Sequence, residues 1–180
     1  SHFYYFGFMK KFILVICAFF FISLAVVIFF FIPNPAAFTT VTVAGKISIS
    51  IPEYLSRTDS LDPSALLQYH DEKKNIFLAV YEETDSVHAS LQDYFKKYSS
   101  GIISKIKRGA LVKYYPEKIN GHDAFIGNIR GTVNETKVYY RIAVLESSSG
   151  FYNIIFGAGD NNQSRYEQDM DSIIHSVKQE

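Results

Sequence analysis

The chain has 180 residues and a mass of 20.5 kDa, a length typical of one domain that excludes a large multidomain enzyme. Eighteen Lys and Arg side chains balance eighteen Asp and Glu side chains, so net charge gives no reason to expect a nucleic-acid partner. A composition of 48% hydrophobic and 20% charged residues excludes a disordered chain. Cys17 is the single cysteine, which excludes a disulfide within these residues and a cysteine-based zinc site.

The apolar character is concentrated near the start of the chain. Phe12 to Ile32 is an apolar run of 21 residues that one serine interrupts, and a helix of that length spans about 31 Å, enough to cross a bilayer. Two lysines precede the run and Pro33, a helix breaker, follows it. Since positive flanks stay in the cytoplasm, we expect a cytoplasmic flank at 1–11, a transmembrane helix or signal anchor at 12–32 and export of the rest.

The alternative is a cleaved signal peptide, with the cleavage site near Ala37 and a secreted product. Its apolar core would be long, because such cores usually have about 7–15 residues. Both interpretations place the domain at 46–180 outside the cytoplasm, in the periplasm or at the cell surface. In the first interpretation, residues 33–45 are the tether, although the threonine-rich part of this stretch also suits the start of a strand.

The first elements of the domain have the two-residue period of strands. Lys46 to Ile51 alternates apolar and polar residues and stops at Pro52, the pattern of a half-buried strand. Leu66 to His70 and Ile76 to Glu82 are expected to form a hairpin, because a polar turn separates them.

The period then changes to that of a helix. Ser90 and Asp93 have the spacing of a capping box, and Gly109 is the expected stop. The apolar residues that follow the cap fall on one helical stripe; they are Leu91, Tyr94, Phe95, Tyr98, Ile102 and Ile106.

Four strands and a second helix complete the expected order. Ser164 and Glu167 predict a capping box at the start of the last helix, and Gly157-Ala158-Gly159 is interpreted as the turn that leads into it. Short connections make neighbouring strands antiparallel. Val138 to Leu145 is apolar on both sides, so helices are expected on more than one face of the sheet. The predicted strands are Leu111 to Tyr115, Asp123 to Val133, Lys137 to Glu146 and Phe151 to Ala158.

Three stretches of this order carry a family resemblance: Ile47 to Pro52, Ile119 to Ala124 and Phe151 to Phe156. Residues 46–178 have the expected order of strand, hairpin, helix, meander and closing helix. In this order they resemble the PsbP-like domain family, which includes PsbP and DcrB-like proteins. The resemblance implies an α+β fold, with an antiparallel sheet of about six to seven strands flanked by helices in an α/β/α sandwich. It also implies a non-enzymatic role in binding a protein or supporting an envelope assembly.

Residue patterns for catalysis are scarce. The sequence has no nucleophile elbow, Walker loop or His-Glu-x-x-His motif, and its five histidines show no metal-ligand spacing. We therefore expect no catalytic residues, no metal and no cofactor. A small-ligand-binding domain or an enzyme with an unrecognised site is the alternative. The enzyme would draw on His70 or His122, which stand beside acidic residues. A permanent structural subunit of an envelope complex is a further alternative.

A local excess of basic residues is the most distinctive surface feature. Seven Lys and Arg side chains lie within 23 residues that contain one acid, Glu117. Such a cluster suits an acidic protein partner or anionic lipid headgroups, whereas the alternative is a solvated helix face. The candidate binding residues are Lys96, Lys97, Lys105, Lys107, Arg108 and Lys113, with Lys118 completing the cluster.

Overall fold

The computed structural model describes residues 36–43, 46–84 and 90–179. Ala36–Glu180 forms a compact unit of its own. The predicted membrane segment at 12–32 lies outside the described residues. In the described ranges, no helix combines the length and the apolar character needed to cross a bilayer.

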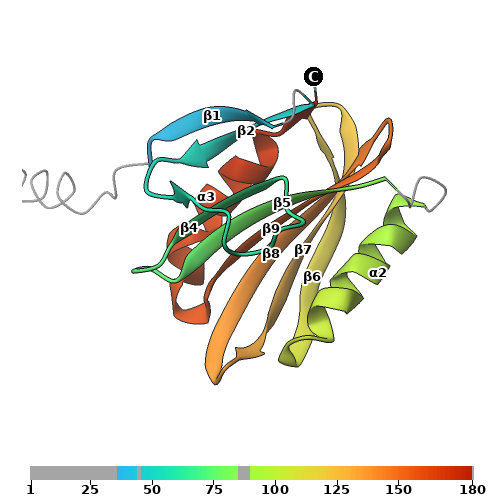
Figure 1. The fold of residues 1–180 in the computed structure, drawn as a ribbon. Coiled ribbons are helices and arrows are strands. Elements are labelled where there is room, and N and C mark those ends of the chain that lie inside the picture. Colours follow the sequence, from blue (N-terminus) through green and yellow to red (C-terminus); the bar gives the residue numbers. More distant parts are fainter. Residues whose placement is uncertain (1–35, 44–45, 85–89, 180) are drawn as a thin grey trace, which may run out of the picture. The chain divides into compact units, whose positions relative to one another are not determined.

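The centre of the domain is a seven-stranded antiparallel sheet (Figure 1). The predicted hairpin and meander are both confirmed within it. Asn120 and Gly121 both have positive φ angles, 48° and 92°, as a two-residue hairpin turn requires. In spatial order the strands are β3 (Ser56–Arg57), β4 (Leu67–Asp71), β5 (Ile76–Glu83), β9 (Gly150–Gly159), β8 (Thr136–Ser147), β7 (His122–Val133) and β6 (Lys107–Ile119).

A separate three-stranded sheet contains the first predicted strand. It consists of β1 (Phe38–Val43), β2 (Ile47–Pro52) and β10 (Lys178–Gln179), with β2 in the middle. The prediction of one sheet is therefore corrected to two. Of the two possibilities for the threonine-rich stretch, the structure has the strand, because β1 pairs with β2 along its whole length.

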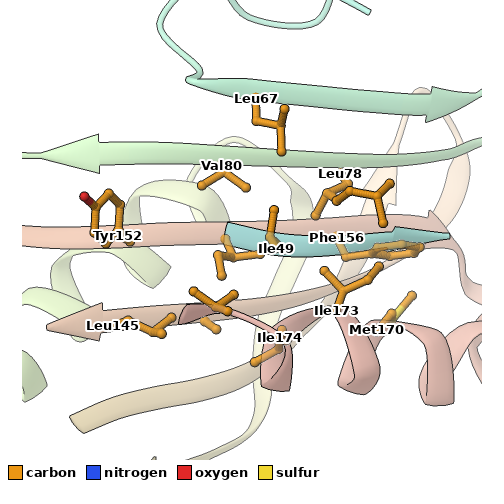
Figure 2. Close-up of a cluster of buried hydrophobic side chains, with 14 of the residues drawn as sticks. Ile49, Leu67, Leu78, Val80, Leu145, Tyr152, Phe156, Met170, Ile173 and Ile174 are labelled. Atoms are coloured by element: carbon orange, nitrogen blue, oxygen red, sulfur yellow. The ribbon is translucent and has the colours of Figure 1, made fainter. Parts of the chain in front are cut away.

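One helix packs against each face of the main sheet. In β9, Ile154 and Phe156 belong to a core with α3 (Gln163–His175), whereas Ile155 belongs to a core with α2 (Leu91–Ile103). Alternate residues of a strand point to opposite faces, so the two helices cover opposite faces, as the apolar pattern predicted. The small sheet adds a further layer on the α3 side, where Figure 2 shows Ile49 of β2 close to Phe156 and Ile173.

Two helix boundaries differ from the sequence prediction. Helix α2 ends at Ile103, and Gly109 lies in β6, which begins at Lys107. The last helix begins at Gln163 after a 3₁₀ turn at Asp160–Asn162, so Ser164 lies inside the helix and forms no cap. The Ser90 cap is confirmed, because its side chain accepts a hydrogen bond from the Asp93 amide.

Candidate binding site

Helix α2 lies on the sheet because a glycine leaves room for it. A Cβ at Gly127 in β7 would lie 2.6 Å from Cζ of Phe95, so the bare backbone lets this buried ring approach the strand. Phe95 also packs near Tyr114 and Phe125, with ring centroids 5.9 Å and 5.5 Å away. These contacts hold the helix over the β6–β7 side of the sheet, as Figure 1 shows.

A pocket opens between the C-terminal half of α2 and the strands that the helix leaves uncovered. It has a volume of about 490 Å³, within the range of small-molecule sites. Its walls combine aromatic and aliphatic side chains with one carboxylate and one ammonium group. The lining residues are Asp62, Phe77, Tyr81, Tyr98, Ile102, Lys105, Ile106, Val133, Tyr140 and Ile155.

The floor of this pocket is a pair of rings over a glycine. Phe77 of β5 and Tyr140 of β8 both pair with Gly157 of β9. Their ring centroids are 5.7 Å apart in an edge-to-face arrangement, which aromatic rings favour. Gly157 is therefore part of the strand, as the predicted strand Phe151 to Ala158 has it, and the interpretation of Gly157-Ala158-Gly159 as a turn is wrong. Beyond the rings, the surface continues as a second hollow of about 340 Å³ that Asn75 and Asn134 border.

The two charged groups of the pocket are differently engaged. Asp62 Oδ1 accepts hydrogen bonds from the Ser64 amide (2.9 Å) and hydroxyl (2.7 Å), and Oδ2 accepts a long one from Tyr81 (3.4 Å). The hydrogen bonds from Ser64 lower the pKa of Asp62, and Lys105 contributes to the same shift. Lys105 makes no ion pair or side-chain hydrogen bond with any residue that the structure describes.

The predicted basic cluster divides between two faces. Lys96 and Lys97 are exposed on α2, and Lys107 and Arg108 are exposed at the start of β6. None of these four pairs with a carboxylate in the described ranges. Together with Lys105 of the pocket, these four residues form what we call the α2 basic surface.

Two members of the cluster lie apart from that surface. Lys113 sits over the ring of Tyr115, 5.1 Å from its centroid. The Tyr115 hydroxyl accepts a hydrogen bond from Arg141, which pairs with Asp171 of α3. Lys113 therefore belongs to the α3 face of the sheet. Lys118 forms an ion pair with Asp123 at 2.7 Å.

Sequence reasoning missed the polar network on the α3 face. Arg141 is 4% exposed; it donates hydrogen bonds to Asn128 and Tyr115, both at 2.9 Å, and forms an ion pair with Asp171. A buried cation needs such partners. The signal in the sequence was a single charge inside an otherwise apolar strand.

The two histidines considered for catalysis lie far apart. His70 is in β4 and His122 begins β7, four strand spacings away in the sheet, or about 19 Å. His70 Nδ1 lies 4.0 Å from Glu72 Oε1. In the described part of the chain, no three His, Cys, Asp or Glu side chains come together as a metal site would require.

This arrangement of sheet, meander and two helices is the PsbP-like fold, and the resemblance predicted from the sequence is confirmed at the level of the fold. Cyanobacterial PsbP (CyanoP) from Synechocystis sp. PCC 6803 is similar over 82% of this chain and 95% of its own length, with a TM-score of 0.64 and 10% identity. The Ran-binding protein Mog1p of Saccharomyces cerevisiae is similar over 80% of this chain and 96% of its own, with a TM-score of 0.52 and 10% identity.

A Pseudomonas aeruginosa protein of unknown function is also similar, over 77% of this chain and 94% of its own, with a TM-score of 0.51 and 12% identity. Comparison of the sequence with protein-family models and with curated proteins finds no match. At these identities the structural likeness establishes the fold alone.

Proposed function

We propose that this protein is a non-enzymatic binding domain that the segment 12–32 anchors to the outer side of a membrane, and that its α2 basic surface docks an acidic protein partner. The observation that carries the proposal is the set of cations on that surface without ion pairs in the described residues. Cations that a domain leaves unpaired on one surface are available to a partner of opposite charge.

The charge distribution of the domain supports this assignment. Residues 90–119 contain seven Lys and Arg and two Asp and Glu, whereas the rest of 33–180 contains nine basic and sixteen acidic residues. Both acids of the basic segment already have partners: Asp93 accepts a hydrogen bond from the Ser90 hydroxyl (2.7 Å), and Glu117 contacts His175 (3.0 Å). The field at α2 is therefore positive within an otherwise acidic domain, which would steer an acidic partner to it.

The comparison with Mog1p adds a second line of support. That protein is described as Ran-binding, so the fold occurs in a protein that works by binding another protein. Because the likeness is one of fold alone, it favours protein binding without naming a partner.

Crosslinking in the membrane tests the proposal directly. The full-length chain carries a photo-reactive residue at the exposed position Gln92 of α2, and captured proteins are identified by mass. We expect Lys96→Glu with Lys97→Glu to weaken capture about tenfold or more, because like charges placed against each other across a protein interface are strongly unfavourable. Lys73→Glu with Lys137→Glu makes the same charge change at exposed positions outside the surface and should leave capture unchanged.

Three outcomes separate the alternatives. Equal capture by the charge-reversal variant and the control variant would show that the α2 basic surface does not dock the partner. Crosslinks to anionic lipid alone would replace the protein partner with a lipid surface. A complex that persists in detergent through high salt would indicate a permanent structural subunit, since docking through exposed charges weakens as salt increases.

A further inference from the structure

The pocket beside α2 has a chemistry that goes beyond the docking of a protein partner, and of the α2 basic surface it uses Lys105 alone. We propose that it binds a small zwitterion of the phosphocholine class, with the quaternary ammonium among the aromatic rings near Asp62 and the phosphate at Lys105. The proposal does not depend on the α2 basic surface having a protein partner.

The cation half of the site consists of rings and one carboxylate. Phe77, Tyr81, Tyr98 and Tyr140 all line the pocket, and aromatic faces attract quaternary ammonium groups. From the residues that the structure describes, Asp62 Oδ2 receives a single hydrogen bond, the 3.4 Å one from Tyr81, so it keeps acceptor capacity for a cation. An ammonium group that carries methyl groups in place of N–H donors suits this mostly apolar wall.

The anion half consists of donors without partners. Lys105 has no ion pair in the described part of the chain, and the hydroxyls of Tyr98 and Tyr140 make no hydrogen bond to any described residue. Burial raises the pKa of both tyrosines, so their hydroxyls keep their protons and can donate. An ammonium and hydroxyl donors are the groups that recognise a phosphate.

The balance of charges selects a zwitterion over a simple ion. The described residues of the lining contribute one carboxylate and one ammonium. A ligand with a single negative charge therefore meets repulsion from Asp62, and one with a single positive charge meets repulsion from Lys105. The volume of about 490 Å³ accommodates a small headgroup of this kind.

Ligand-detected NMR on the full-length chain in phosphatidylglycerol nanodiscs, which contain no choline, tests the proposal. Saturation transfer to the N-methyl protons reports binding of phosphocholine, and calorimetry gives its Kd. A phosphatidylcholine fraction in the disc distinguishes a lipid headgroup from a free ligand. Competition between this lipid and free phosphocholine indicates that lipid headgroups reach the pocket, and the absence of competition indicates a free ligand.

Variants locate each half of the ligand. We expect Lys105→Gln to weaken phosphocholine binding about tenfold but not to weaken choline binding, because choline only loses the repulsion from Lys105. We expect Asp62→Asn to weaken the binding of both ligands about tenfold. Asp59→Asn and Lys73→Gln, at exposed positions outside the pocket and outside the α2 basic surface, should bind like the parent chain. Thermal unfolding confirms that each variant is folded, and the exposed side chain of Lys105 makes Lys105→Gln the safer test.

Three results would overturn the proposal. The first is no saturation transfer at millimolar phosphocholine. The second is equally tight binding of hexyl phosphate, which would show that the cation half contributes nothing. The third is an equal loss of phosphocholine and choline in Lys105→Gln, which would show that Lys105 does not contact the phosphate.

Discussion

Gly157 illustrates how much one residue without a side chain determines in this fold. A Cβ at this position would overlap the ring of Phe77 and lie 2.8 Å from Cδ1 of Tyr140. The floor of the pocket therefore exists because β9 has no side chain where the two rings meet. We expect Gly157→Ala to destabilise the protein by about 1–3 kcal/mol, the usual cost of overfilling a packed site, as measured by urea unfolding.

Gly101 provides the matched control for this substitution. It lies exposed within α2, and a Cβ there would have no heavy atom within 4 Å. Since glycine costs about 0.5–1 kcal/mol relative to alanine inside a helix, Gly101→Ala should stabilise the protein by that amount. Equal effects of the two substitutions would contradict the role assigned to Gly157.

Residues of this kind could not be assigned from the sequence. The residues Gly157-Ala158-Gly159 are typical of a turn. Only the pairing of β9 with both β5 and β8 shows that the rings of Phe77 and Tyr140 occupy the space beside Gly157. Arg141 is similar, because its partners Asn128 and Asp171 are distant in sequence. The Ser90 cap was predictable, since it depends on a neighbour three residues away.

At the scale of elements, His175 joins the end of α3 to β6. Its Nδ1 lies 2.7 Å from the Asp171 carbonyl oxygen and its Nε2 lies 3.0 Å from Glu117 Oε1. Both neighbours are acceptors, so only the imidazolium, with two N–H donors, satisfies both. Partial burial lowers the pKa of His175. The hydrogen bonds to Glu117 and to the Asp171 carbonyl raise this pKa by more than burial lowers it, so the net shift is upward.

This shift predicts a dependence of stability on pH. A raised pKa in the folded state stabilises the protein below the unfolded value of about 6.5, and the stabilisation is lost as pH rises through the folded pKa. His175→Gln should therefore lose stability relative to the parent chain at pH 6 and lose less at pH 8. Because both side chains are partly exposed, we expect a difference of at most about 1 kcal/mol. Urea unfolding at both pH values measures it, and a constant difference would be inconsistent with this ion pair.

The elements also show where sequence reasoning succeeds. The hairpin β4–β5 and the meander β6–β9 follow from local turns, and the apolar stripe of α3 follows from helical period. The small sheet does not, because β2 pairs with β10 more than a hundred residues later. The start of β6 was also missed, since Arg108 adopts a positive φ of 56° and the register shifts between Lys107 and Ala110, which hides the two-residue period.

For the whole molecule, the proposed membrane anchor at 12–32 raises the question of which side of the membrane would hold the domain. The positive flank before residue 12 predicts a cytoplasmic N-terminus and an exported domain. With the proposed docking at the α2 basic surface, an exported domain would meet an extracytoplasmic partner, whereas a cytoplasmic domain would not. The orientation therefore decides which class of partner is available.

Cysteine labelling measures this orientation, because Cys17 is the single native cysteine and is easily replaced. In a Cys17→Ser background, Ser148→Cys places a thiol at an exposed position in the turn between β8 and β9. In bacteria with a permeabilised outer membrane, a membrane-impermeant maleimide should label this thiol before lysis of the inner membrane. A thiol from Ser1→Cys should react only after lysis. Labelling of Ser148→Cys only after lysis would place the domain in the cytoplasm. If the N-terminal segment that carries Ser1→Cys is lost and the domain is released from the membrane, the segment is a cleaved signal peptide.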